Sequence, residues 1–569
     1  MGAIFGMVGE GSLDEVEAMG EQVAHRGEFQ RVWSPAPGVF LGQASHRPFE
    51  VDASCQLAAD WNLQGGGASL VERYARHGRE ALAALRGTFA IALCDGPNRI
   101  VLAVDQVGYK SLFHAVLRGR FAFASEYKAL LALNDFPREP DRTAIQHYLA
   151  TKYPLGGRSF LARARTLQGG QMLQYRDGNA TVAAYWRPAI HVVQRSRAEH
   201  AAVVRDALLE TVHRQIHSYE HAGVTLGGGL DAALVLGAIR RVAPDVRISS
   251  FTVGSSIDEW EMVGARQTAE AFETEHHEYL FDASTLPAEL PRLVWLTEDC
   301  GGREEAMLQM RVLREAGAQV GVVFGGHGAD VLFGGMPRHR LVGLAERLPI
   351  LTTPFRELFQ LSQASIPPGT YIGRAFKTAV YGRTPPETLH VPGGTSAGVY
   401  WSPDVNEFIR TTIQRMHSFN YLEPQHEIAG AAFHSPFLDP DMIAASLTVP
   451  GWLKSGWRRQ KVVLREASVE ILPEKIRHRK KAIQRLDVEG ETGAVLSQLA
   501  GEWLVDSALE QHQLLTSDQL QMLRRERDRA RQSRVVAHRL WSVLSLECWA
   551  RHFLSARHGA SSQTPAGSD

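Results

Sequence analysis

The sequence predicts an α+β domain, then an α/β domain built on a parallel sheet, and then a mainly helical final third. Short apolar runs separated by turn residues fill residues 1–185. Apolar runs then alternate with helical patterns over residues 197–325, and helical, arginine-rich patterns dominate residues 345–555. Because alternating strands and helices need crossover connections, this middle region predicts a parallel sheet with helices on both faces.

Hairpin-like strands predict the first domain. Turn residues such as Asp95-Gly96-Pro97-Asn98 separate apolar runs, as hairpins require. Helical patterns interrupt the strands at residues 69–85 and 141–151. Strands are expected at residues 39–41, 89–93, 100–104 and 120–124. This mixture favours an α+β or sandwich-like domain.

The second domain opens with a helix, because apolar residues recur at helical spacing through residues 197–218. Strands are expected at residues 222–226, 247–253, 276–280 and 320–325, helices at 232–242 and 259–272, and further helical segments up to residue 316. Ligands of such sheets bind at the carboxyl ends of the strands, so the loops that follow these strands are candidate binding sites.

Chain organisation and charge exclude several classes of protein. We expect domains over residues 1–185 and 195–555, followed by a small, polar, disordered tail over residues 556–569. Lys and Arg number 61 against 62 Asp and Glu, which argues against a nucleic-acid partner. No run of about 18 apolar residues occurs, so we expect no membrane insertion.

The cysteines indicate a reducing compartment. The four of them, Cys55, Cys94, Cys300 and Cys548, lie far apart in the chain. No Cys-x-x-Cys pair or His/Cys cluster surrounds them, which argues against a structural zinc site and a disulfide framework. We therefore expect a cytoplasmic protein.

A glycine-rich loop follows the first strand of the α/β domain. Residues 226–232 read Leu-Gly-Gly-Gly-Leu-Asp-Ala and lead into a helix. Glycines let backbone amides approach a phosphate, and a helix N-terminus favours an anion. Asp231 suits such a site only if a cation such as Mg²⁺ joins it to the phosphates. The alternative is a flexible turn in which Asp231 caps the helix.

A second loop repeats this pattern after the strand at residues 320–325. It contains Gly326, Gly328 and Asp330. Mg²⁺ commonly takes one or two protein carboxylates together with phosphates and water. The two loops together therefore predict a shared Mg²⁺ site over a triphosphate, with Asp231 and Asp330 as the metal ligands.

Together these motifs resemble the synthetase domain of the asparagine synthetase family, a PP-loop ATP pyrophosphatase. Further stretches that resemble this domain are Ser435–Asp439, Lys461–Ala467, Leu472–Ile476 and Arg479–Lys481. Stretches that resemble the family's glutaminase domain are His25–Gly27, Arg86–Ala90, Asp105–Phe113 and Ala124–Leu130. The resemblance covers residues 1–485. It implies an N-terminal-nucleophile-type (Ntn) glutaminase-like sandwich, followed by a PP-loop, HUP-like domain with a parallel sheet and a mostly helical C-terminal part.

The resemblance also implies site residues. It places Lys461 and Lys481 near the reacting phosphates, where a lysine stabilises negative charge. The alternative for both lysines is a solvated basic face. The residues that it implies for ATP are Leu226, Gly227, Gly228, Gly229, Leu230, Asp231, Ala232, Thr252, Val253, Gly326 and Gly328.

Three departures from the family pattern bear on function. Glutamine-hydrolysing members begin Met-Cys-Gly-Ile, and the cysteine is the nucleophile; here position 2 is Gly2. We therefore expect no glutamine hydrolysis, so the substrate must supply the amine. The serines that flank the family's phosphate loop are Gly227 and Ala232 here. Each lost hydroxyl contact costs roughly 1 kcal/mol, which ATP turnover tolerates.

The third departure is His327. Asparagine synthetases place Glu at this position and β-lactam synthetases place Tyr, so a histidine is more similar to lasso peptide cyclases. A histidine with a pKa near 7 suits acceptance of a proton from the attacking amine. The alternative is a loop histidine bonded to the backbone.

The sequence thus predicts an ATP- and Mg²⁺-dependent enzyme that forms an intramolecular amide, with a lasso peptide cyclase as the favoured type. The expected substrate is a precursor peptide whose Asp or Glu side chain is adenylated and then attacked by its N-terminal amine. Expected partners are a leader peptidase and a leader-binding protein. The rivals are a β-lactam-synthetase-type ring closer, an ammonia-dependent asparagine synthetase and a non-catalytic ATP-binding scaffold.

Overall fold

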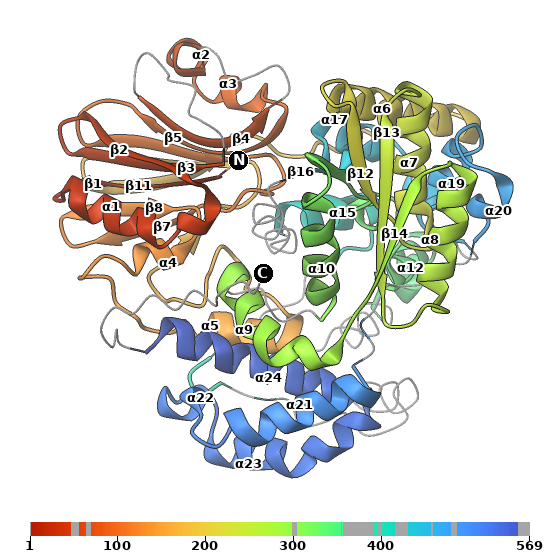
Figure 1. Ribbon diagram of the computed structural model, residues 1–569. Helices are drawn as coiled ribbons and strands as arrows, with labels where there is room; N and C mark the ends of the chain where they lie inside the picture. The colour runs from red at the N-terminus through yellow and green to blue at the C-terminus, as the bar shows by residue number, and fades with distance from the viewer. Residues whose placement is uncertain are drawn as a thin grey trace.

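A computed structural model gives the structure of the chain. It describes residues 2–46, 56–63, 70–298, 304–353, 356, 389, 391–394, 401–415, 431–456, 459–479, 486 and 488–555. Figure 1 shows a two-sheet body beside a parallel sheet flanked by helices, with a helical layer beneath both. The predicted fold class is confirmed.

The N-terminal body is a sandwich of two antiparallel sheets. One sheet has the order β2-β3-β1-β8-β7-β9 and the other β11-β10-β6-β5-β4. Buried residues of both sheets, such as Ile4 and Leu102, share one core. The strands are β1 (Gly2–Gly9), β2 (Phe29–Ala36), β3 (Val39–Ser45), β4 (Leu57–Leu63), β5 (Gly87–Cys94), β6 (Arg99–Val104), β7 (Phe113–Leu117), β8 (Arg120–Ala124), β9 (Arg165–Thr166), β10 (Gln171–Arg176) and β11 (Asn179–Ala184).

Five α-helices accompany the sandwich within the part of the domain that the structure describes, and one expected helix is divided. The pattern over residues 69–85 forms two helices, because Gly78 has φ +56°, which is outside the helical region. The helices are α1 (Leu13–Glu21), α2 (Leu70–His77), α3 (Arg79–Ala83), α4 (Tyr127–Leu130) and α5 (Arg142–Thr151).

The second body is a parallel sheet of order β14-β13-β12-β15-β16. The chain moves outward from β12 in one direction and then returns to add β15 on its other side. This reversal creates a switch point between β12 and β15, where ligands of such folds bind. The elements are α6 (Arg197–Ile216), β12 (His221–Thr225), α7 (Leu230–Val242), β13 (Arg247–Gly254), α8 (Trp260–Ala271), β14 (Glu275–Leu280), α9 (Leu286–Thr297), α10 (Glu305–Gly317), β15 (Val322–Phe324) and β16 (Ala432–His434).

The edge strand β16 was not predicted. It has only three residues, too few to display a periodic pattern, and it pairs with β15 through Val323 opposite Phe433. Further helices of this body are α11 (Ala329–Leu332), α12 (Pro337–Arg347), α15 (Val405–Arg415), α17 (Pro440–Leu447), α18 (Gly451–Lys454), α19 (Val462–Ala467) and α20 (Glu474–Arg477).

The C-terminal helices join the two bodies. The buried indole of Trp549 donates a hydrogen bond to the Tyr127 hydroxyl of α4 at 2.6 Å. The Tyr148 hydroxyl of α5 donates to the Ser542 carbonyl at 3.1 Å. These contacts place α24 beneath the sandwich, as Figure 1 shows. The helices are α21 (Gly490–Trp503), α22 (Ala508–Gln511), α23 (Ser517–Glu526) and α24 (Arg534–Phe553).

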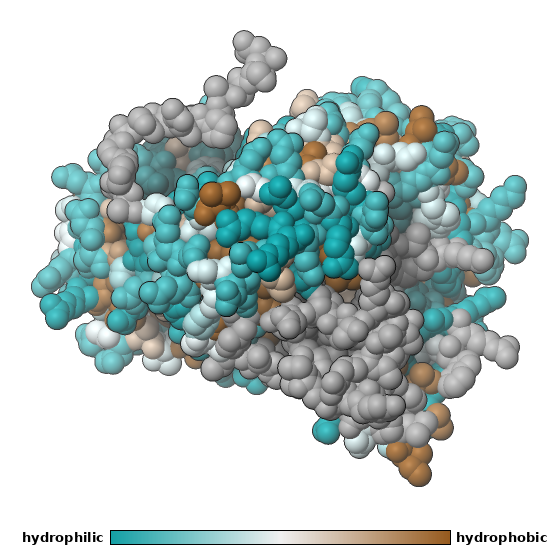
Figure 2. Space-filling view, turned by 90° about the horizontal axis from the view of Figure 1, so that it is seen from below, coloured by the Kyte–Doolittle hydropathy of each residue, from teal (hydrophilic) through white to brown (hydrophobic). Residues whose placement is uncertain are grey.

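Three further features concern the surface, the membrane and the cysteines. Figure 2 shows a largely hydrophilic face with scattered apolar side chains. None of the described helices has the length and apolar character of a membrane span. Cys94 and Cys548 are free and buried, while Cys55, Cys300 and the tail at 556–569 lie outside the described residues.

Candidate functional site at the sheet's switch point

The two glycine-rich loops meet at the switch point. The first leaves β12 and the second leaves β15, and these two strands are hydrogen-bonded neighbours. A Cβ atom on Gly326 would lie 2.7 Å from the Ala232 amide nitrogen and 2.8 Å from the Asp231 carbonyl carbon. Only glycine permits this approach, so the sequence of the second loop is fitted to the backbone of the first.

The first loop ends at the N-terminus of α7. Gly229 is the N-cap, and Asp231 is the second residue of the helix. The first amides of a helix have no partner within it, and they favour an anion. The thirteen-residue helix therefore directs its positive end at the space beside the second loop.

Lys461 joins the two predicted metal ligands. Its ammonium group lies 2.6 Å from Asp231 Oδ1 and 2.5 Å from Asp330 Oδ1. The lysine is only 4% exposed. Burial alone lowers its pKa, but the two carboxylates outweigh that effect and raise the pKa above its usual value. Lys461 is therefore charged, and its backbone has φ +56°, a strained conformation for a residue with a side chain.

The same carboxylates form a donor set that suits Mg²⁺. One comes from each loop, and both already face a single cation. Within the described ranges, no group of three or more His, Cys, Asp and Glu side chains is placed to hold a metal ion. Two carboxylates completed by phosphate oxygens and water match the usual Mg²⁺ mode, so the residues fit a metal that arrives with a nucleotide.

Close packing also shapes the second loop. Gly328 has φ +89° and caps α11. A Cβ atom on Gly335 would lie 1.9 Å from Asp330 Oδ1 and 2.3 Å from Lys461 Cε. The Gly335 amide donates to the Asp330 carbonyl at 2.8 Å. These glycines hold the Asp330 side chain beside Lys461.

Glu261 is a site residue that the sequence analysis missed. It is buried on α8, and its Oε2 accepts a hydrogen bond from the Gly228 amide at 2.5 Å. It belongs to the acidic run Asp258-Glu259-Trp260-Glu261, in which nothing distinguishes one carboxylate from another. Only the packing of α8 on the first loop identifies it.

Arg479 braces the same loop. Its Nη1 donates to the Gly264 carbonyl and the Thr268 hydroxyl, both at 2.7 Å, and to the Gly228 carbonyl at 3.5 Å. The Arg479–Lys481 motif thus contributes a brace between the loop and α8. Lys481, the predicted catalytic lysine of this motif, lies outside the described residues.

The strand-end residues expected at the ATP site lie along the first loop. The Leu226 amide donates to the Phe251 carbonyl of β13 at 2.8 Å, which continues the pairing of the two strands. Thr252 and Val253 follow on β13 and are both buried. The Thr252 hydroxyl has no hydrogen-bond partner among the described residues. Gly227, Gly229 and Ala232 are partly exposed, so the loop itself remains accessible.

His327 differs from its expected state. Burial lowers its pKa to about 4, not to the value near 7 that the sequence analysis expected, so the ring is neutral at pH 7. Its ring centroid lies 5.4 Å from that of Phe433, and its carbonyl accepts a hydrogen bond from the Ser435 hydroxyl at 2.5 Å. Nδ1 has no partner among the described residues. His327 therefore packs the second loop against Phe433 and Ser435.

The N-terminal domain has no room for a nucleophile at position 2. A Cβ atom on Gly2 would lie 1.7 Å from the Ala44 carbonyl oxygen. The Gly2 amide donates to Asp60 at 2.8 Å, and Arg26 donates to the Gly2 carbonyl at 2.7 Å. Lys110 Nζ lies 2.9 Å from the same buried Asp60. Buried ion pairs thus fix the backbone at position 2.

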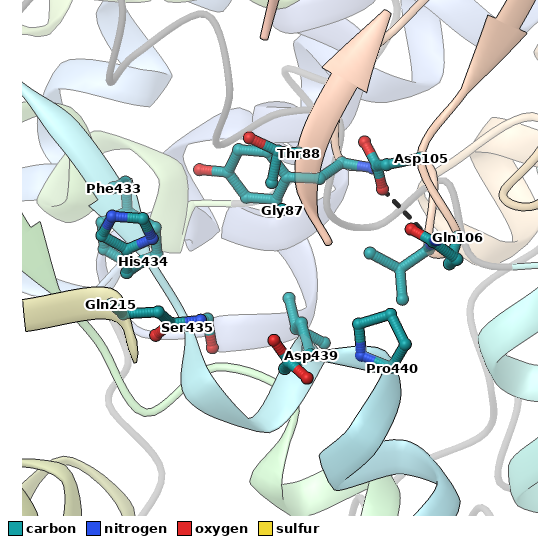
Figure 3. A pocket seen from close by; sticks show the side chains of 13 residues that line it. Gly87, Thr88, Asp105, Gln106, Gln215, Phe433, His434, Ser435, Asp439 and Pro440 are labelled. Atoms are coloured by element: carbon teal, nitrogen blue, oxygen red, sulfur yellow. Dashed lines mark hydrogen bonds between the residues drawn. The ribbon is translucent and has the colours of Figure 1, made fainter. Parts of the chain in front are cut away.

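A small cavity lies at the junction of the two domains. It has a volume of 40 Å³, more than the roughly 10–15 Å³ that one water needs. Figure 3 shows Gln106 of the sandwich on one side and Gln215 of α6 on the other. Both amide oxygens are buried without a partner among the described residues. The cavity therefore suits ordered water that links the domains.

Two family models match the chain. The one described as asparagine synthase matches residues 203–551, and the one described as a glutamine amidotransferase domain matches residues 54–186. The first contains both glycine loops and Lys461. The second contains the buried Asp60 and Lys110.

Curated relatives include enzymes of two kinds. Asparagine synthetase [glutamine-hydrolyzing] 1 of Bacillus subtilis is 29% identical over 48% of this chain and 43% of its own length. Asparagine synthetase [glutamine-hydrolyzing] 3 of the same organism is 23% identical over 73% of this chain and 69% of its own length. Carboxyethyl-arginine beta-lactam-synthase of Streptomyces clavuligerus is 28% identical over 50% and 52%. The chain thus spans about half the length of two of these relatives.

Proposed function

This chain belongs to the asparagine synthase family, and on that premise we propose that it uses ATP to join a carboxyl group to an amine. The observation that carries the proposal is the meeting of Asp231, Asp330 and Lys461 at the switch point. Two carboxylates and a buried lysine beside a helix N-terminus suit a magnesium-bound triphosphate.

In the first step, the substrate carboxylate oxygen attacks the α-phosphorus of ATP, and the bond to pyrophosphate breaks. Activation is needed because a free carboxylate is a poor electrophile. Mg²⁺ held by Asp231 and Asp330 would neutralise phosphate charge. The amides of the first loop bind the phosphates. Lys461 donates a hydrogen bond to the pyrophosphate oxygens, on which negative charge develops. Lys481 is a second candidate for this role.

In the second step, the amine attacks the carbonyl carbon of the acyl-adenylate, and AMP leaves with the original carboxylate oxygen. The attacking nitrogen must lose a proton. His327 is our candidate acceptor, because its ring is neutral and Nδ1 is free of partners among the described residues. A base with a pKa near 4 holds the proton weakly, so its contribution belongs at the low end of the usual range.

We propose a lasso peptide cyclase as the specific activity. Gly2 offers neither a nucleophile nor space for one, which supports an amine source other than glutamine. An amine on the substrate itself then makes the reaction intramolecular. A peptide held with its amine beside the activated side chain supplies the proximity that ring closure needs. A precursor peptide, a leader peptidase and a leader-binding protein are the proposed partners.

A β-lactam-synthetase-type ring closure is the second candidate, and the Streptomyces clavuligerus relative favours it. That activity needs a small amino acid substrate in place of a peptide. An ammonia-dependent asparagine synthetase is a third candidate. It would make asparagine from aspartate and ammonium, which neither cyclase does.

The test is a reaction with Mg²⁺, ATP and a synthetic core peptide that has a free N-terminal amine and an internal Asp or Glu side chain. We expect pyrophosphate release and a peptide that has lost one water. The matched control is the same peptide with an acetylated N-terminus, which should support pyrophosphate release without ring closure. Asparagine formation from aspartate and ammonium, with no change in the peptide, would contradict the proposal.

A further inference from the structure

The Glu261 carboxylate binds the Gly228 amide of the first glycine-rich loop, an amide that could otherwise bind a phosphate. Its side chain is 6% exposed and reaches from α8 to accept the Gly228 hydrogen bond at 2.5 Å. A carboxylate is an anion, as a phosphate is, and the N-terminus of α7 that begins after Gly229 favours either one. The loop therefore already holds an anion that belongs to the protein.

Gly227 makes this contact possible. A Cβ atom at Gly227 would lie 2.6 Å from Glu261 Oε2 and 3.5 Å from its Cδ. A serine at this position, as in the family pattern, would push the carboxylate away from the loop. The Glu261 carboxylate can thus approach the loop only because residue 227 is a glycine.

The packing of α8 keeps Glu261 close to the loop. A Cβ atom on Gly264 would lie 2.5 Å from the Gly228 Cα. On the other side, a Cβ atom on Gly228 would lie 2.6 Å from the Trp260 ring. Neither contact leaves a gap between helix and loop. This close packing keeps α8, and with it Glu261, beside the loop.

The charges around the loop match this arrangement. Lys461 is held by Asp231 and Asp330, so its ammonium group neutralises the two predicted metal ligands. The Glu261 carboxylate accepts the hydrogen bond of the Gly228 amide, and Arg479 donates to the carbonyl of Gly228. Side chains of both signs thus contact the two loops.

We propose that Glu261 is a positioning residue that sets the affinity of the loop for phosphates by competing for the Gly228 amide. This inference rests on the proposed nucleotide site. A pyrophosphate or triphosphate group takes the amide only after the carboxylate turns away. The chain thereby binds phosphates more weakly than the same loop with an unoccupied amide.

The experiment is calorimetric titration with magnesium pyrophosphate. Glu261→Gln keeps the size and an oxygen acceptor but removes the charge, and we expect about tenfold tighter binding because a charge-assisted hydrogen bond no longer competes. Glu261→Ala and Gly227→Ser, which remove or displace the carboxylate, should tighten binding in the same direction. Thermal melting of each variant shows that it is folded.

Glu270→Gln is the matched control, because Glu270 is exposed on the same helix. Its charge is screened over the length of α8, so binding should change less than about twofold. Titration with adenosine, which has no phosphate, is a second control and should give the same affinity for the wild type and Glu261→Gln. Equal tightening of both ligands would mean a general structural effect and would overturn the inference.

Two other outcomes also decide the matter. If the wild type binds pyrophosphate, and Glu261→Gln and Glu261→Ala bind it equally well or more weakly, the proposed role of Glu261 is overturned. The proposed nucleotide site is not affected by that result. Absence of pyrophosphate binding in every protein overturns the nucleotide site, and the inference with it.

Discussion

At the scale of single residues, the Lys461 ammonium group holds the two glycine-rich loops together. Asp231 and Asp330 would repel each other across the switch point if no cation lay between them. Lys461 supplies that cation from a buried position on a third segment of the chain. Asp231 and Asp330 would hold a Mg²⁺ bound to a nucleotide, and Lys461 would then face the phosphates.

Removing either carboxylate charge should abolish catalysis without unfolding the chain. We expect Asp231→Asn or Asp330→Asn to reduce pyrophosphate release by at least about 10²-fold, because a metal–phosphate site loses several kcal/mol of stabilisation. Asp258→Asn, which changes an exposed acid near the same sheet edge, is the control and should retain activity. Near-wild-type release by both site variants would show that these loops are not the metal site.

His327 should act on ring closure more than on adenylation. Its pKa of about 4 means that it stays neutral from pH 6 to 8 and becomes protonated only as the pH falls toward 4. We expect His327→Ala to slow ring closure by about 10²-fold and to leave peptide-dependent pyrophosphate exchange nearly unchanged.

The pH profile is the second readout for His327. Between pH 6 and 8 the wild type and the variant should follow parallel profiles, since the ring does not titrate there. Equal losses in exchange and closure would instead assign His327 a structural role beside Phe433 and Ser435.

At the scale of elements, the sequence predicts the strand–glycine–helix units well. The apolar strand, the glycine run and the helix that follows leave a clear pattern, and the two carboxylates lie within it. Glu261 and the edge strand β16 leave no such pattern. A buried carboxylate in an acidic run looks like its neighbours, and a three-residue strand shows no period. The low pKa of His327 depends on burial by Phe433, which is distant in the sequence.

The contact between the two loops should not tolerate a methyl group. Gly326→Ala would place a Cβ atom 2.7 Å from the Ala232 amide. We expect the loops to separate, with a stability loss of about 1–3 kcal/mol and at least about a tenfold fall in pyrophosphate release. Gly321→Ala is a matched control just before β15, because nothing lies within 4 Å of its added Cβ. Unchanged activity in Gly326→Ala would mean that the loops do not need this approach.

At the scale of the whole molecule, hydrogen bonds join the N-terminal domain to the second domain and to the C-terminal helices. Glu298 of the synthetase side accepts hydrogen bonds from the Tyr127 and Lys128 amides at 2.8 and 2.7 Å. Trp549 of α24 bonds to Tyr127 as well. The cavity between Gln106 and Gln215 lies at the same junction. These contacts tie the sandwich to the second domain.

Restoring the missing cysteine should not restore glutamine hydrolysis. Gly2→Cys would place its Cβ 1.7 Å from the Ala44 carbonyl oxygen, so the strand pair must separate. We expect a lower melting temperature and no glutamate release from glutamine above a blank, with or without ATP. Clear glutamate release by this variant would show that the pocket can reopen.

In the proposed reaction, a substrate carboxylate attacks the α-phosphorus of ATP at the switch point and then becomes an amide. The most direct measurement uses a core peptide with ¹⁸O in its acceptor carboxylate, together with ATP and Mg²⁺, and mass analysis of the nucleotide. We expect AMP that carries one ¹⁸O and a peptide that has lost one water. Unlabelled AMP, or ADP together with ¹⁸O-labelled phosphate, would contradict the proposed reaction, since the carboxylate would then not have attacked the α-phosphorus.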